Sequence, residues 1–73
     1  MNWLATAPDG RDLEVIDYSG RIMWVVREGN GHAEIVGFSR TASGARLRAC
    51  LAWKDSTRKP IPDYLLEQTK GAA

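Results

Sequence analysis

Residues 12–27 read DLEVIDYSGRIMWVVR, two runs rich in β-branched and aromatic residues on either side of a Ser-Gly pair. Gly20 supplies the positive φ angle that a two-residue hairpin turn needs. We therefore expect two antiparallel strands, at 12–18 and 21–27, joined by a tight turn.

The second of these strands carries apolar side chains on both faces. Ile22, Trp24 and Val26 share one face, because alternate residues of a strand point to the same side. Met23 and Val25 share the other face. A strand that is apolar on both sides is typical of the centre of a sheet, so we expect this strand to be central.

The first of these strands has a less regular pattern. Leu13 and Val15 alternate with two acidic residues, which is typical of a half-buried strand. Ile16 and Tyr18 then fall on the same face as those acidic residues. Two explanations are open at this point: a bulge in the strand, or a second apolar surface that is partly covered.

Turn signals flank the hairpin at nearly regular spacing, at residues 8–10 (PDG) and 29–31 (GNG). Each separates segments that are rich in β-branched and aromatic residues. These signals predict a further strand at 3–7 and another at 32–38. The sequence therefore favours an antiparallel meander of three or four strands.

After Phe38 the period of the sequence changes. Residues 42–54 are rich in Ala, Leu and Arg, contain no Pro and follow several candidate N-cap residues, and so predict a helix. Its small residues form a stripe that lets the helix approach a sheet closely. Pro62 and Gly71 frame a short second helix at 62–69.

These elements predict an α+β fold: a three- to four-stranded antiparallel β-meander packed against one α-helix, with a short C-terminal helix as a lid. With 73 residues the chain has room for one hydrophobic core, so we expect residues 1–73 to form a single domain. Cys50 is the only cysteine, which excludes an intrachain disulfide and a metal site built on several cysteines, and indicates a reducing compartment. No basic leader and no long apolar run is present, so we expect a cytoplasmic protein.

Few residues are candidates for catalysis. His32, the only histidine, follows a predicted turn, where a solvated side chain is expected. Cys50 falls within the predicted helix, on or near its packed face, so it is expected to be a small buried residue rather than half of a Cys-His pair. The acidic residues of the strands lack the spacing of acid–base or metal sites. We expect a non-enzyme with no catalytic residues, no cofactor and no bound metal.

The small net charge of +1 hides an asymmetry between the two halves of the chain. Residues 1–38 carry six acidic residues and three arginines, a net charge of −3. Residues 39–73 carry seven basic residues and three acidic ones, a net charge of +4. If the halves form different surfaces, the protein has an acidic side and a basic side; the other explanation is a mixed, solvated surface.

The strands, the following GFSRT (residues 37–41) and a helix with Ala45 that ends at Trp53 resemble the three-stranded sheet plus helix of AP2-type and integrase arm-binding domains. The resemblance covers about residues 12–54 and implies DNA recognition through the sheet. The side chains that could serve there are Arg11, Arg21, Trp24 and Arg27. The sheet is the acidic half, however, and phosphate binding requires a positive surface. The second route to DNA is through the basic half, with Arg40, Arg46, Arg48, Arg58 and Lys59.

In size, in its meander-plus-helix layout and in its lack of a catalytic motif, the chain is similar to the small phage-encoded inhibitors of bacterial defence systems, anti-CRISPR proteins above all. The resemblance implies an inhibitor in the cytoplasm of a bacterial host cell that docks on a Cas protein or complex and blocks DNA binding or cleavage. We therefore expect a host protein or protein complex as the partner, with nucleic acid as the alternative and no membrane. An exposed edge strand could also pair two copies of the chain into a homodimer.

Charged residues with expected exposure, and one tryptophan as an apolar anchor, are the candidates for the protein interface. They are Asp12, Glu14, Asp17, Glu34, Arg40, Arg48 and Trp3.

Overall fold

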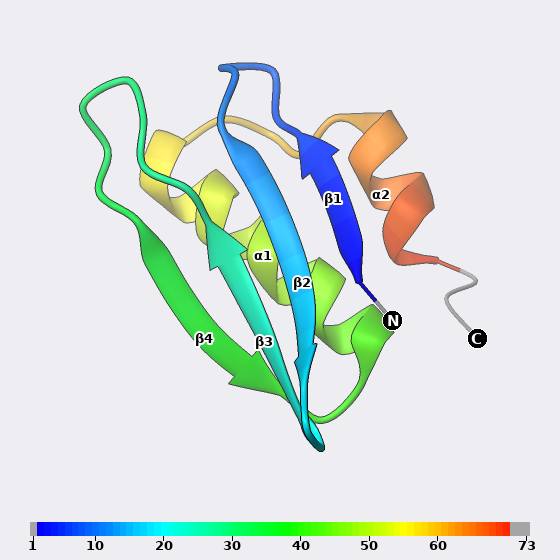
Figure 1. The fold of residues 1–73 in the computed structure, drawn as a ribbon. Coiled ribbons are helices and arrows are strands. Elements are labelled where there is room, and N and C mark those ends of the chain that lie inside the picture. Colours follow the sequence, from blue (N-terminus) through cyan, green and yellow to red (C-terminus); the bar gives the residue numbers. More distant parts are fainter. Residues whose placement is uncertain (1, 71–73) are drawn as a thin grey trace.

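Four antiparallel strands form one sheet in the order β1-β2-β3-β4, and two helices pack against a single face of it (Figure 1). The structure is a computed structural model that describes residues 2–70. Its strands and helices are β1 (Trp3–Thr6), β2 (Asp12–Tyr18), β3 (Arg21–Val26), β4 (Ile35–Ser39), α1 (Ala42–Thr57) and α2 (Asp63–Thr69). This arrangement confirms the α+β fold, with four strands in the predicted three- to four-stranded meander.

The fourth strand begins later than the sequence predicts. It was expected from residue 32 but starts at Ile35, because Gly29 and His32 close a tight turn with two backbone hydrogen bonds of 2.8 and 3.0 Å. Asn30 (φ 50°) and Gly31 (φ 80°) supply the positive φ angles of that turn. The turn therefore forms a small hairpin of its own above β4.

Both helices have clear end signals. Thr41 is the N-cap of α1, since its side chain accepts a 3.0 Å hydrogen bond from the Gly44 amide. α1 continues to Thr57, beyond the predicted end at residue 54, and Arg58 follows it in the left-handed conformation. Pro62 precedes α2 as its N-cap. Within residues 2–70, neither helix is long and apolar enough to cross a membrane.

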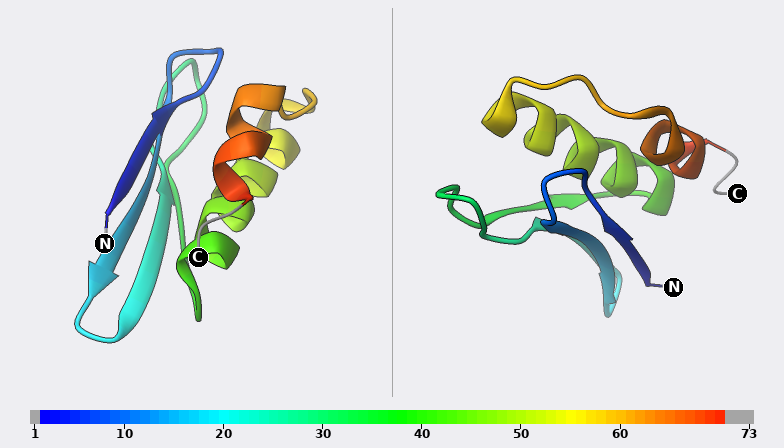
Figure 2. Two further views of the ribbon diagram at one scale, coloured as in Figure 1. Left: turned by 90° about the vertical axis from the view of Figure 1, so that its right-hand side faces the viewer. Right: turned by 90° about the horizontal axis from the view of Figure 1, so that it is seen from above.

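The hydrophobic core lies between the sheet and the helices. Leu13 and Val26 are fully buried on the sheet, and Trp53 of α1 is the largest fully buried side chain. Ala45 and Ala49 are also fully buried, so the small-residue stripe does bring α1 close to the sheet. Figure 2 shows the consequence for residues 2–70: both helices lie on one side of the sheet, and no helix covers the opposite side.

Trp24 on β3 lies against its cross-strand neighbour Gly37 on β4. A Cβ atom at position 37 would lie only 2.2 Å from the indole Cζ2 atom, far inside van der Waals contact. Gly37 therefore provides the space that the indole occupies on the helix-facing side of the sheet.

We expect Gly37→Ala to destabilise the domain by roughly 1–3 kcal/mol, because the indole must leave its position or the strands must shift. Urea unfolding followed by circular dichroism measures this change. The W24L variant is the control background, since its smaller side chain removes the clash. In that background Gly37→Ala should lower the free energy of unfolding much less. An equal cost in both backgrounds would rule out the steric explanation.

Candidate binding site on the open face of the sheet

An apolar surface lies on the side of the sheet that faces away from the helices. Cross-strand partners share a face of a sheet, so the strand register assigns each side chain to one side. Ile16, Met23 and Phe38 form one row on the open side. Leu4 and Val36 lie at the two ends of the next row, with Glu14 and the buried Val25 between them. We call the following residues the open-face patch: Leu4, Ile16, Tyr18, Met23, Val36 and Phe38.

Four members of the open-face patch are strongly exposed. The exposed fraction is 64% for Leu4, 58% for Tyr18 and 48% for both Val36 and Phe38. No helix of the described chain covers this side of the sheet (Figure 2). Large apolar side chains exposed together on one face of a protein are typical of an interaction site.

The register also decides between the two explanations for the irregular pattern of β2. The pairing of β2 with β3 runs without interruption from Leu13 opposite Val26 to Tyr18 opposite Arg21. The strand therefore has no bulge in this stretch, and Ile16 and Tyr18 belong to a second apolar surface, which no helix covers.

Arg27 neutralises much of the acidity at one end of the open face. Its guanidinium forms ion pairs with Glu14 and, at 2.9 Å, with Glu34. The hydrogen bond to Glu14, and to a smaller extent the one to Glu34, raises the pKa of Arg27 above its usual range. Asp12 lies beside them, since its carbonyl accepts from the Arg27 amide and its carboxylate accepts a 3.2 Å hydrogen bond from Thr6. These three predicted interface residues lie together, but the arginine and the threonine hydroxyl already bind them.

Two other predicted interface residues lie elsewhere. Asp17 is at the opposite end of β2, in register with Ile22 and Ser39 on the helix-facing side. Trp3 is half-buried against the core, and its Nε1 donates a 2.9 Å hydrogen bond to Gln68 Oε1. Trp3 therefore helps to hold α2 in place and does not stand out as the exposed anchor that the sequence suggested.

The basic residues proposed for DNA binding do not form one surface either. Arg46 turns inward: its guanidinium donates to the Gln68 carbonyl at 3.1 Å and lies 5.6 Å from the Trp3 ring centre. Arg58 and Lys59 follow the C-terminal end of α1. Arg40 precedes the 16-residue helix and is therefore about 24 Å away along its axis. Arg48, ten residues before Arg58, is about 15 Å away.

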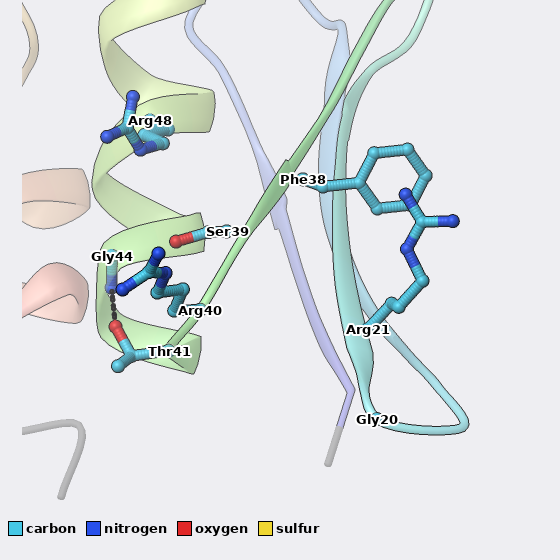
Figure 3. Close-up of a pocket in the computed structure, with 8 residues that line it drawn as sticks. All are labelled: Gly20, Arg21, Phe38, Ser39, Arg40, Thr41, Gly44 and Arg48. Carbon is cyan, nitrogen blue, oxygen red and sulfur yellow. Dashed lines mark hydrogen bonds between the residues drawn. The ribbon is translucent and has the colours of Figure 1, made fainter.

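Arg40 and Arg48 line an open cavity of about 720 Å³ at the end of β4, together with Arg21. Figure 3 shows that β4 divides this cavity: Arg40 and Arg48 lie on the α1 side, while Arg21 and Phe38 lie on the open face. The Arg21 guanidinium carbon is 4.2 Å from the Phe38 ring centre, close enough for a cation–π contact. Sequence reasoning missed Arg21 at this site, because only the sheet pairing brings the hairpin turn to the start of α1.

The DNA-reading side chains implied by the AP2-type resemblance are also divided. Arg11 is only 2% exposed and does not belong to the open face. Its guanidinium donates to the Arg27 carbonyl at 2.8 Å and to the Ala33 carbonyl at 3.0 Å. Trp24 lies on the helix-facing side, packed against the core. Arg21 is therefore the only one of the four that lies on the open face without an ion pair in the described structure, and DNA binding stays a prediction.

His32 and Cys50 lie in different environments. Ser56 Oγ lies 3.1 Å from His32 Nδ1 and accepts a hydrogen bond from Arg11, so His32 packs against α1 and is not the solvated turn residue that was expected. Cys50 is fully buried, and burial raises the pKa of its thiol to about 11. Within the described residues, no group of three or more His, Cys, Asp or Glu side chains could hold a metal ion.

Comparisons of the chain with protein-family models, with curated proteins and with solved structures find no match, so the functional argument for this α+β domain rests on its own geometry.

Proposed function

We propose that the protein is a non-enzymatic binding module that docks on another protein through the open-face patch. One observation carries this proposal: the sheet is covered on one face only, and its bare face exposes Leu4, Tyr18, Val36 and Phe38. The centres of protein interfaces are enriched in aromatic and apolar side chains, and their rims are polar and charged.

The position of these side chains on regular strands favours tight binding. Burying a large apolar side chain contributes roughly 1.5–3 kcal/mol relative to leaving it in water. Side chains held on paired strands need little ordering when a partner arrives, so more of that free energy is retained as affinity. The arginines and carboxylates at the two ends of the face would then orient the partner.

The likeness of build to anti-CRISPR proteins supports a Cas protein or complex as the proposed target. The paired carboxylates change how we expect such docking to occur. Because Arg27 already binds Glu14 and Glu34, an acidic surface that imitates DNA is not the main contact that we propose. An apolar contact with a charged rim takes its place.

A photo-crosslinking amino acid at position 38 would test the proposal in host cells. We expect it to capture one defined protein, whereas the same group at position 51, an exposed site on α1, should not. The captured protein would then be purified and its dissociation constant measured. We expect the V36S/F38S variant to bind at least about tenfold more weakly, because two exposed apolar anchors are lost.

The matched control is L47S/L51S, which removes two apolar side chains of similar exposure, 41% each, from the outer side of α1. Its affinity should remain within about twofold of wild type, since these residues lie away from the open-face patch. Capture from position 51 but not from position 38, or an equal loss of affinity in both double variants, would refute docking through the open face.

A further inference from the structure

No strand of the described chain pairs with the outer edge of β4. Figure 1 shows β4 (Ile35–Ser39) as the last strand of the sheet, next to β3 alone. Within residues 2–70, the backbone of this strand makes no hydrogen bond outside the β3–β4 ladder. Alternate amide and carbonyl groups of an edge strand point outward and can pair with another strand.

The opposite edge of the sheet is partly occupied by the protein itself. The Tyr64 hydroxyl of α2 donates a 2.6 Å hydrogen bond to the Thr6 carbonyl of β1. Trp3 of the same strand is bound by Gln68 of α2. Among residues 2–70, no side chain is hydrogen-bonded to the backbone of β4 in this way. The five residues of β4, IVGFS, include no charged residue and no proline of the kind that protects edge strands.

Charged side chains of opposite sign lie at the two ends of β4. At its C-terminal end lie Arg21, Arg40 and Arg48, for which the described structure contains no ion pair with a carboxylate. At its N-terminal end Glu34 shares a single arginine, Arg27, with Glu14. The first end therefore presents three arginines and the second presents the exposed carboxylate of Glu34.

We propose that two copies of the chain pair through their β4 strands, antiparallel and centred on Gly37, to form a symmetric dimer. This register places Val36 of each copy opposite Phe38 of the other, which is a favourable cross-strand pair on the open face. It also places Arg40 opposite the partner's Glu34, twice in the dimer. Arg40 follows the last residue of β4, and its side chain lies on the α1 side there (Figure 3). It is exposed, so this long side chain can turn around the end of the strand toward that carboxylate on the open face.

The charged side chains at the two ends of β4 favour antiparallel pairing of the two strands. Parallel pairing would bring the three arginines of the two copies together and would be repelled. In a symmetric antiparallel contact both copies use the same edge strand, so the contact is complete after two copies and does not propagate into a fibre. The product is a continuous eight-stranded sheet whose two open-face patches lie on the same side.

Sedimentation velocity of the purified protein over a wide concentration range tests the dimer. We expect a monomer–dimer equilibrium in which E34R alone and R40E alone each weaken dimerisation by about tenfold, because two symmetry-related attractions become repulsions. An equimolar mixture of E34R and R40E should restore the dimer, since each arginine or glutamate then meets an opposite charge. E67R, a charge reversal on α2 beside the opposite edge of the sheet (Figure 1), is the control and should leave the equilibrium unchanged.

A protein that stays monomeric at every concentration would overturn the proposal. So would a dimer that responds equally to E67R and R40E, or a mixture of E34R and R40E that does not associate better than either variant alone. Restoration in the mixture also shows that the variants are folded. The measurement uses only the purified chain, so its failure would leave docking of another protein on the open face untouched.

Discussion

Replacing Trp53 with alanine is expected to leave most of the protein unfolded at 25 °C. The indole is 1% exposed and is the largest fully buried side chain. Truncating a buried tryptophan costs about 3–5 kcal/mol through lost burial and the cavity that remains. A single core in a chain of this size supplies roughly 3–5 kcal/mol in total. Urea unfolding followed by far-ultraviolet circular dichroism measures the loss.

Leu51→Ala is the matched control on the same helix. Leu51 is 41% exposed, so its truncation should change the free energy of unfolding by no more than about 0.5 kcal/mol. If the W53A and L51A variants unfold at similar urea concentrations, Trp53 does not hold the core together as described.

The Trp53 indole also connects α1 to the loop between β1 and β2. Trp53 Nε1 donates a 3.1 Å hydrogen bond to Asp9 Oδ1. Burial alone would raise the pKa of Asp9, but the bonds from Trp53 and from the Arg11 amide, with the charge of Arg11, hold that pKa below its usual value of 3.8. A lowered folded-state pKa stabilises the protein above the unfolded-state value, and this stabilisation is lost as the pH falls through the folded-state value. When the pH falls from neutral to below 3.8, the Trp53→Phe variant should therefore lose less stability than the wild-type protein does.

Arg11→Met is expected to destabilise the domain by about 2–4 kcal/mol, because the methionine keeps the apolar stem but removes every donor. The Arg27 and Ala33 carbonyls lose their bonds from the guanidinium, and Ser56 Oγ loses a 3.3 Å bond. These partners hold the segment between β3 and β4 against α1. Urea unfolding gives the size of the effect, and amide hydrogen exchange in residues 28–34 should show that this segment opens first.

Arg48→Met is the control for loss of an arginine, since Arg48 is exposed. This substitution should lower the free energy of unfolding by less than about 0.5 kcal/mol. Arg11→Lys should recover only part of the loss, because an ammonium cannot reproduce the fixed fork of guanidinium donors. A stability of R11M close to that of R48M would show that the buried network contributes little.

Much of the fold could be predicted because its signals are local. The Ser19-Gly20 pair fixed the hairpin, and its strand bounds for β2 agree with the structure. The small residues of α1 correctly predicted a helix packed closely on the sheet. The start of β4 was missed, because Gly29 and His32 bond to each other across a turn, and nothing in the adjacent sequence distinguishes that turn from a strand.

The candidate site was harder to predict because it depends on tertiary packing. Both faces of β3 are apolar, and the sequence does not show that the two helices would cover the same one. Arg11 and Arg46 look like surface residues in the sequence, yet one lies in the core and the other turns inward to α2. The pairing of Arg27 with two glutamates likewise follows from the register of three strands, which no single segment reveals.

The binding surface itself can be observed through its methyl groups. With the captured protein partner in hand, methyl resonances of the isotopically labelled domain should be compared with and without a saturating amount of that partner. We predict that Leu4, Ile16, Met23 and Val36 shift strongly while Leu47 and Leu51 on α1 keep their positions. Shifts confined to Leu47 and Leu51, with the open-face methyls unchanged, would contradict docking on the open face of the sheet.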